Sequence, residues 1–139
     1  MKILNMERLK RKLARIPDAV KRRAQADLLL AGREINMLQR SLAPKDDGVL
    51  AGTIRTEALT DGTVGVEIKA GGAATTKAVR NSEKGNSPNY DYALAQEFGT
   101  KDMSPNPFFY PGYRARRKKA LANVRRGWKR AMKDAASNG

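Results

Sequence analysis

The stretch Tyr90 to Gly112, YDYALAQEFGTKDMSPNPFFYPG, holds most of the aromatic side chains of this 139-residue chain. It contains six of the seven tyrosine and phenylalanine residues, and Pro105, Pro107 and Pro111 alternate with the later rings. Aromatic rings bury large areas and dominate the energetics of cores and interfaces. The remainder of the chain is poor in aromatics and rich in charge. We therefore expect the fold to be organised around this stretch.

The stretch predicts a short helix followed by an extended segment. Apolar residues recur at helical spacing over 90–98, and Gly99 is a suitable residue just past a helix end. The recurring prolines make 100–111 extended or turned. Pro111 suits the first position of a final helix over 111–135, because an N–H at that position would have no partner within the helix.

Long helices are predicted on both sides of this stretch. Apolar residues recur every three or four positions over 17–42, where Pro17 and Asp18 suit the first turn. A similar stripe over 2–16 belongs to the same helix through a kink or to a separate one. In the final helix, apolar residues including Trp128 form one face, and lysines and arginines cover the rest. Both stripes are the usual mark of helices packed on a core.

The central part of the chain predicts strands. Residues 53–58 and 63–68 alternate around Asp61-Gly62, which indicates a β-hairpin, and 75–80 adds a third strand. We read the polar segment near 81–89 as a mobile loop and the C-terminal tail as frayed. The predicted fold is α+β in a single domain over 1–139. It has a long N-terminal helix, a small antiparallel sheet of about three or four strands, a short helix and a long basic C-terminal helix.

The net charge of +14 is unevenly distributed along the chain. Residues 1–45 and 112–139 are strongly basic, whereas 46–111 hold more acidic than basic side chains. Three explanations remain open: contact with nucleic-acid phosphates, contact with an acidic protein surface, and solvated helix faces. For the first, the residues expected to face DNA are Arg114, Arg117, Arg125 and Arg126. A mean hydropathy of −0.63 and the lack of a long apolar run predict a soluble chain without a membrane span or signal peptide.

The residue types present argue against catalysis. The chain has no cysteine and no histidine, which excludes Ser-His-Asp and Cys-His mechanisms and the usual zinc sites. Asp46 and Asp47 lie in a Pro/Gly loop and read as turn formers rather than metal ligands. Glu97 lies among aromatics, and we favour a local salt bridge or a cap on backbone amides over a catalytic role. We expect no enzyme activity, no catalytic residue, no cofactor and no metal.

Two segments resemble a known family. Residues 43–50, APKDDGVL, with Thr53-Ile54, are similar to an "AP-x-D-T-G-x-L-x-x-S-I" segment. Tyr92-Ala93, Glu97-Phe98-Gly99-Thr100 and Pro107-Phe108-Phe109-Tyr110-Pro111 resemble a "Y-A…E-F-G-T…P-F-x-x-P" signature. Both belong to the neck or tail-component proteins of Hong Kong-type lambdoid siphophages. The chain departs from them at Asp47, Thr53 and Gly112, where the family tends to have Thr, Ser and Ala.

The resemblance implies a structural virion protein at the head–tail junction of a tailed phage, a gene transfer agent or a prophage remnant. It would complete the neck or tail end as a hexameric ring, in contact with neighbouring neck, connector or tail-tube proteins and with DNA in the channel. Its location would be the virion, and the host cytoplasm during assembly. The alternative is a basic domain that contacts DNA phosphates without sequence specificity. A metal-dependent nuclease is a third, weaker hypothesis.

The candidate site residues fall into two groups. The expected subunit or partner interface comprises Asp46, Asp47, Thr100, Lys101, Asp102, Met103 and Asn106. The expected packing anchors of the family-like motif are Tyr92, Glu97, Phe98, Gly99, Pro107, Phe108 and Pro111. The aromatic stretch is thus predicted to be a joint between elements, and its loop residues are predicted to touch a neighbour.

Overall fold

The structure is a computed structural model of the chain that describes residues 8, 11–12, 14–78 and 89–137. Its elements follow one another as helix α2 (Asp18–Leu42), helix α3 (Val49–Thr53), strands β1 (Arg55–Ala58) and β2 (Val66–Lys69), 3₁₀ helix η1 (Ala73–Thr75), strands β3 (Thr76–Ala78) and β4 (Asn89–Asp91), and helices α4 (Tyr92–Phe98) and α5 (Phe109–Ser137). Two long helices therefore frame a small central part, as the sequence predicts.

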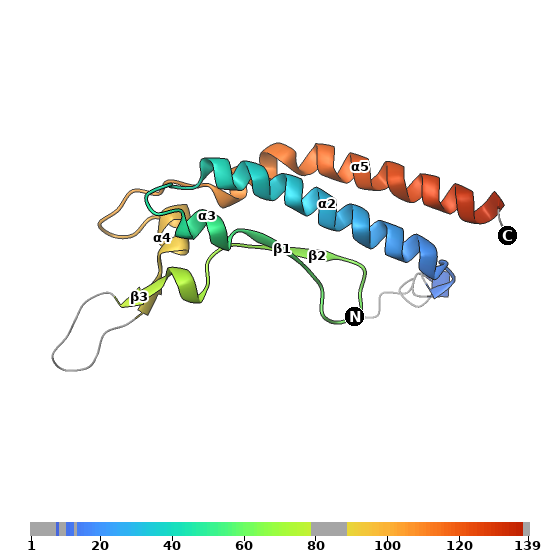
Figure 1. Cartoon of the computed structure of the whole chain (residues 1–139), viewed down its shortest axis with the longest axis horizontal. Helices are drawn as coiled ribbons and strands as arrows, with labels where there is room; N and C mark the ends of the chain where they lie inside the picture. Colours follow the sequence, from blue (N-terminus) through green and yellow to red (C-terminus); the bar gives the residue numbers. More distant parts are fainter. Residues whose placement is uncertain (1–7, 9–10, 13, 79–88, 138–139) are drawn as a thin grey trace.

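Helices α2 and α5 lie side by side and run in opposite directions along the molecule (Figure 1). Small and branched residues form their contact: Ala31 and Ile35 of α2 and Ala120 of α5 are buried together. The two helices approach closely at Gly112, where an added Cβ would lie 2.6 Å from Cγ and 3.1 Å from Cα of Gln39. Any side chain at this position would push the two helices apart, because real Cβ atoms do not approach so closely.

The hairpin β1–β2 packs on α2, below that helix in the view of Figure 1. On its inner face, Thr56 of β1 hydrogen-bonds to Asn36 of α2, and Ile68 of β2 packs against the cluster that Ala31 and Ile35 of α2 form with Ala120 of α5. Both strands therefore contact α2, and Ile68 also reaches the core that the two helices share. On the outer face, charged side chains pair across the strands, with Lys69 Nζ at 2.8 Å from Glu57 and 2.9 Å from Glu67.

This pairing sets the charge state of the hairpin's outer face. Glu57 and Glu67 stand directly opposite each other, an arrangement of like charges that destabilises an antiparallel pair. Lys69 contacts both, and Arg55 lies 2.7 Å from Glu57. Hydrogen bonds from Lys69 and Arg55 lower the pKa of Glu57, and hydrogen bonds to Glu57 and Glu67 raise the pKa of Lys69. The outer face is thus internally neutralised.

The smaller elements gather at one end of the molecule, beyond the hairpin (Figure 1). A second core forms there from Ala43, Leu50, Ile54, Ala93 and Phe108. Ile54 and Phe108 have no exposed surface. The segment after α2, the helix α3 and both parts of the aromatic stretch therefore meet in this core. We call this end of the molecule the head.

The α+β class and the order of the main elements are confirmed, but the predicted single sheet is two separate two-stranded sheets. Strand β3 pairs with β4 instead of extending the hairpin. The reason is the turn after β2: Gly71 has a positive φ of 85°, and η1 follows before the next strand begins. The chain has changed direction by then, so β3 meets the residues just before α4.

Other boundaries also differ from the prediction. Residues 49–53 form α3 where we expected a loop and the start of a strand. The final helix begins at Phe109, two residues before Pro111, and the segment 89–91 is a strand. The expectations for 2–16, for the loop near 81–89 and for the tail after Ser137 fall wholly or largely outside the described residues.

The two phenylalanines of the stretch allow a matched test of the head core. We expect Phe108→Ala to lower the free energy of unfolding by about 3–5 kcal/mol, because it leaves a cavity among buried side chains. Phe98→Ala removes an exposed ring and should cost less than about 1 kcal/mol. Chemical denaturation of both variants measures the difference. Equal losses would show that Phe108 is not a core residue.

Candidate protein interface

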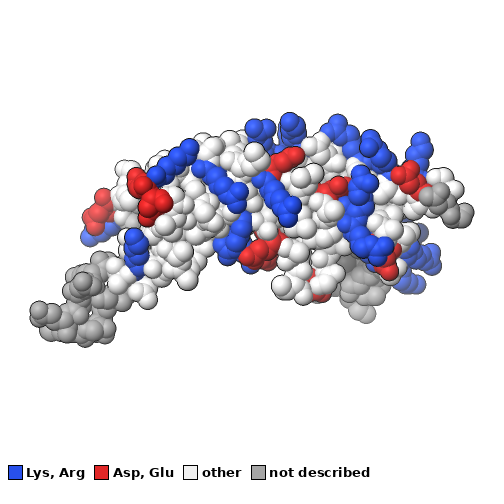
Figure 2. Space-filling view, viewed as in Figure 1, with Lys and Arg blue, Asp and Glu red and all other residues white. Residues whose placement is uncertain are grey.

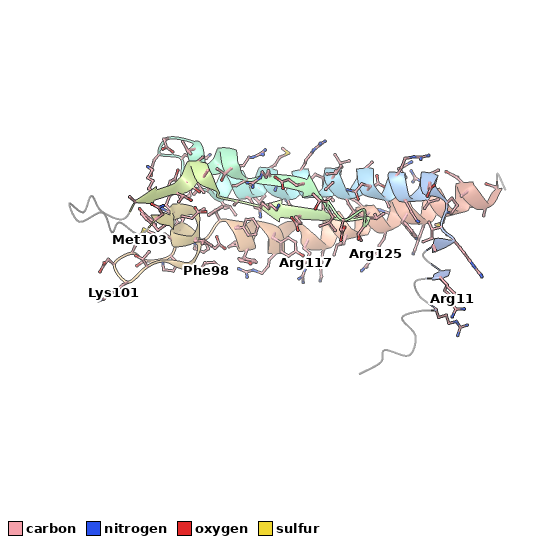
Figure 3. The ribbon with its side chains drawn as sticks, turned by 90° about the horizontal axis from the view of Figure 1, so that it is seen from below. Arg11, Phe98, Lys101, Met103, Arg117 and Arg125 are labelled. Carbon is pink, nitrogen blue, oxygen red and sulfur yellow. The ribbon has the colours of Figure 1, made fainter. Side chains whose placement is uncertain are left out.

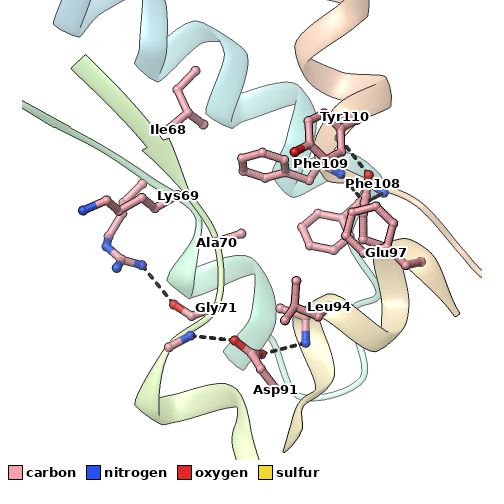
Figure 4. A pocket seen from close by; sticks show the side chains of 14 residues that line it. Ile68, Lys69, Ala70, Gly71, Asp91, Leu94, Glu97, Phe108, Phe109 and Tyr110 are labelled. Carbon is pink, nitrogen blue, oxygen red and sulfur yellow. Dashed lines mark hydrogen bonds between the residues drawn. The ribbon is translucent and has the colours of Figure 1, made fainter. Parts of the chain in front are cut away.

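The carboxylate of Glu97 holds the start of helix α5. Its Oε2 accepts hydrogen bonds from the backbone N–H groups of Phe108 and Phe109, both at 2.8 Å, and its Oε1 accepts one from Tyr110 at 2.9 Å (Figure 4). The next residue, Pro111, has no N–H. The first N–H groups of a helix have no partner within it, so this one side chain satisfies them all. Its negative charge also suits the positive end of the helix dipole.

A buried amide network joins the same helix end to α2 and the hairpin. Gln39 Nε2 donates to the carbonyl of Phe109 at 2.9 Å, and its Oε1 accepts from Asn36 Nδ2 at 3.0 Å. Asn36 Oδ1 in turn accepts from the hydroxyl of Thr56 at 2.7 Å. Both amide side chains are buried, so each unmet hydrogen bond would carry a desolvation penalty. The network therefore fixes how the three elements meet.

A second carboxylate is used in the same structural way. Asp91 precedes α4, and its Oδ1 accepts from the N–H of Ala93 at 2.9 Å and from the hydroxyl of Thr75 at 2.6 Å. Its Oδ2 accepts from the N–H of Gly72 at 3.2 Å. Asp91 is an N-cap that also ties α4 to the turn after β2. Glu97 and Asp91 thus bind backbone and hydroxyl donors, and of the two roles expected for Glu97, a salt bridge or a cap on backbone amides, the structure shows the cap.

The expected packing anchors differ in how far they are buried. Phe108 and Glu97 are buried, Tyr92 packs half-buried against the head core, and Pro111 lies in the first turn of α5. Gly99 ends α4 with a φ of 76°, and an added Cβ would meet the carbonyl oxygen of Met103 at 2.8 Å. Pro107 is exposed.

For Phe98 the prediction of a core anchor is wrong, since 63% of its surface is exposed. Successive residues of a helix point about 100° apart. Glu97 turns inward to reach the amides of α5, so Phe98 is turned outward. There its ring lies near that of Tyr110, with 6.2 Å between centroids.

The structure brings the two halves of the predicted interface together. Asp46 and Asp47 come from the turn before α3, and Thr100, Lys101, Asp102 and Met103 from the turn after α4, yet all six line one pocket of about 600 Å³. We call it the loop pocket. The seventh residue, Asn106, does not line it, although its N–H binds the carbonyl of Gln96, which does. Figure 3 shows Lys101 and Met103 on the loop that projects from the head.

Aromatic side chains form part of the loop pocket's wall. Tyr90 and Tyr92 line it, and the ammonium of Lys77 lies 5.1 Å from the ring centre of Tyr92. Burial raises the pKa of the Tyr92 hydroxyl, and the charges of Asp47 and Asp91 add to the effect. The pocket thus combines rings with charges of both signs, which is the composition of a protein contact rather than of a closed cavity for a small apolar ligand.

A second hollow, which the sequence reasoning missed, lies on the other side of α4. About 450 Å³ in volume, it lies between the end of β2 and the start of α5 (Figure 4). Leu94, Phe98, Phe109 and Tyr110 form its apolar wall. Leu94 and Phe98 are 60% and 63% exposed and stand one turn apart on α4. In the sequence, this apolar pair at positions i and i+4 could have indicated the hollow. A seven-residue helix that buries its other face leaves such a pair exposed to solvent.

The basic residues of α5 are free of internal ion pairs within the described part of the chain. The helix carries ten lysines and arginines and one aspartate, and no described carboxylate lies within salt-bridge distance of any of the ten. Figure 2 shows blue side chains spread along both long helices on the visible face. Such uncompensated charge favours contact with an anionic partner.

The four arginines expected to face DNA do not share one surface. Arg114 and Arg125 are eleven positions apart and so lie within about 20° of each other around the helix. Arg117, three positions after Arg114, is its neighbour on the helix surface. Arg117 and Arg125 project on the same side of the molecule as Phe98 (Figure 3). Arg126 instead lines a hollow between α5 and α2 with Arg23 and Asp27. The expected group therefore divides into three residues and one.

Among the described residues, no three acidic side chains are grouped so that they could hold a metal ion. None of the described helices is both long and apolar enough to cross a membrane. Comparisons of the chain with known protein families, with curated proteins and with solved structures find no match.

The capping role of Glu97 predicts a specific loss of stability. We expect Glu97→Gln to lower the free energy of unfolding by about 2–4 kcal/mol, because the amide nitrogen turns a donor toward buried backbone donors. Glu34→Gln, on the exposed face of α2, should change it by about 0.5 kcal/mol or less. Thermal and urea unfolding measure both. If the two variants unfold alike, the carboxylate does not hold α5 in place.

Proposed function

We propose that this chain is a structural virion protein that forms a ring at the head–tail junction of a tailed phage or phage-like particle. The ring completes the neck or tail end and joins head to tail. The chain itself contributes contact surfaces, not chemistry.

The observation that carries this proposal is the loop pocket. Two segments that resemble the phage family lie about fifty residues apart in the sequence, and their exposed residues line one pocket at the head. Other residues of the same segments, among them Phe108 and Glu97, are buried and hold the head together. In each segment, the buried residues therefore form the core of the head, and the exposed residues lie on its surface. That division of roles suits a subunit that docks end-on against its neighbours.

The shape and charge of the molecule support the same proposal. The head, the hairpin and the two long helices make an elongated body, with the head at one end and the start of α2 and the end of α5 at the other (Figure 1). A contact between unlike surfaces of identical subunits closes into a ring when the rotation between them permits. In such a ring the basic helices give the assembly a strongly positive surface, which suits a channel for DNA.

Charge reversal in the loop pocket tests the ring. We expect Asp102→Arg to reduce assembly of tailed particles, because it places a cation beside Lys101 at the proposed contact. The matched control is Asp61→Arg, an equally exposed aspartate in the hairpin turn. Electron microscopy of particles made with each variant, and without the protein, gives the readout. Normal tailed particles in the absence of the protein would refute the proposed function.

Phosphate binding by α5 is a second candidate function, favoured by the ten cations without a described ion-pair partner. We expect DNA affinity to fall with salt, and replacement of Arg114, Arg117 and Arg125 by serine to reduce the slope of log K against log salt by about one for each residue. Each of the three arginines is also replaced singly. Arg33→Ser on α2 is the control, and its slope is compared with that of each single α5 variant. Fluorescence anisotropy with duplexes of unrelated sequence measures the slope. Affinity that does not change with salt would exclude this candidate.

A further inference from the structure

Strand β2 has a free edge with a definite hydrogen-bonding pattern. The N–H of Leu59 donates to the carbonyl of Gly65 at 3.2 Å, and in an antiparallel ladder the bonded pairs alternate with non-bonded ones. From this register the pairs Glu57–Glu67 and Arg55–Lys69 are bonded, and the backbone groups of Val66 and Ile68 point away from β1. Within the described residues, no hydrogen bond reaches these groups of Val66 and Ile68.

The second hollow lies at the end of this edge, where Ile68 but not Val66 lines it. Its lining includes Ile68 and the residues that follow it to Gly72 on one side, and Leu94, Phe98, Phe109 and Tyr110 on the other. Figure 4 shows the strand running along one wall and the rings along the opposite wall. We call the free edge of β2 together with these four apolar side chains the edge groove. Its backbone side offers hydrogen bonds, and its side-chain wall offers apolar surface.

Unpaired cations stand beside the groove. Ile68 and Tyr113 pack against the same core residues, and the guanidinium of Arg117 lies 5.9 Å from the ring centre of Tyr113. Tyr110 lines the groove, and Arg114 and Arg117 follow it one and two turns along the same side of α5, with the exposed Leu121 and then Arg125 beyond them. A segment lying in the groove would meet positive charge and apolar surface together.

We propose that the edge groove binds an extended acidic segment of a different protein, which pairs with β2 as a third strand. Apolar side chains of the segment enter the groove, and its carboxylates meet the arginines of α5. Addition of a strand to an open sheet edge is a common mode of peptide recognition, in which backbone bonds give affinity and pockets give specificity. It also adds a third strand to a two-stranded sheet, which is marginal by itself.

The charge of the chain selects a different protein over a second copy as the occupant. The acidic residues of this chain are scattered, and only Asp46 and Asp47 are adjacent, so a second copy offers no segment along which carboxylates recur. The identification of the partner as a neighbouring neck, connector or tail-tube protein rests on the proposed function. The binding of an acidic strand does not depend on it.

Synthetic peptides test this inference on the purified full chain. The probe is a short fluorescent peptide of alternating valine and glutamate, and fluorescence anisotropy measures its binding. We expect this peptide to bind about tenfold more tightly than a peptide of alternating valine and lysine, which is about the effect of one lost charge-assisted contact. N-methylation of alternate amides of the acidic peptide should abolish binding, because it removes the donors that pair with β2.

A pair of variants with a matched control locates the site. We expect Leu94→Ser with Phe98→Ser to weaken binding of the acidic peptide about tenfold or more, as expected for apolar anchors. Leu30→Ser with Met37→Ser removes two similarly exposed side chains from α2 and should leave binding unchanged. Circular dichroism of both double variants establishes that they remain folded.

Three outcomes would overturn the inference: equal binding of the lysine peptide, equal binding of the N-methylated peptide, and unchanged binding by the Leu94/Phe98 double variant. The first outcome would show that the charge of the peptide does not matter, the second that strand pairing does not occur, and the third that the groove is not the binding site. These results are separate from the particle assay. If particles form normally without the protein but the acidic peptide binds as expected, the proposed function is refuted and the binding of an acidic strand by the edge groove is supported. If assembly needs the protein and the peptide does not bind, the inference fails alone.

Discussion

One carboxylate is the constraint on which the rest of the structure depends. Glu97 receives the first backbone N–H groups of α5, and Pro111 stands where the next unpaired N–H would be. A 29-residue helix with ten cations and one aspartate gains little from its own charge pattern. Its direction is therefore set where it begins, by a side chain from another helix. The motif pair E-F-G-T and P-F-x-x-P has a physical explanation here, since the glutamate of the first caps the helix that starts inside the second.

The position of α5 in turn determines the other contacts. Gln39 binds the carbonyl of Phe109, and Gly112 lets α2 approach until no side chain would fit between them. The hairpin then packs on α2, where Thr56 bonds to Asn36, and Ile68 reaches the core that α2 and α5 share. The inward turn of Glu97 also has a consequence for the surface. It rotates Phe98 outward, beside Leu94 and Tyr110, and so creates the apolar wall of the edge groove. The cap that stabilises the fold and the surface proposed for binding have one geometric origin.

The two proposed contact surfaces differ in what they offer a neighbour. The loop pocket presents aspartates, lysines and tyrosines, a composition suited to a polar, complementary contact. The edge groove presents unpaired backbone groups beside exposed rings, with arginines close by. They lie on opposite sides of α4, so both can be occupied at once. A subunit that joins unlike neighbours needs two such surfaces.

The sequence by itself determined the local features of this protein. Periodicity placed the two long helices and the hairpin, Gly99 marked the end of α4, and the loop positions of Asp46, Asp47 and 100–103 indicated that these residues are exposed. Only the tertiary structure decided the rest. Propensity did not reveal α3, because its five residues are stabilised by the head core, and local pattern did not separate the two sheets. The burial of Phe108, the exposure of Phe98 and the free edge of β2 follow from where distant segments meet, because a side chain's environment depends on its partners in space and not on its neighbours in the chain.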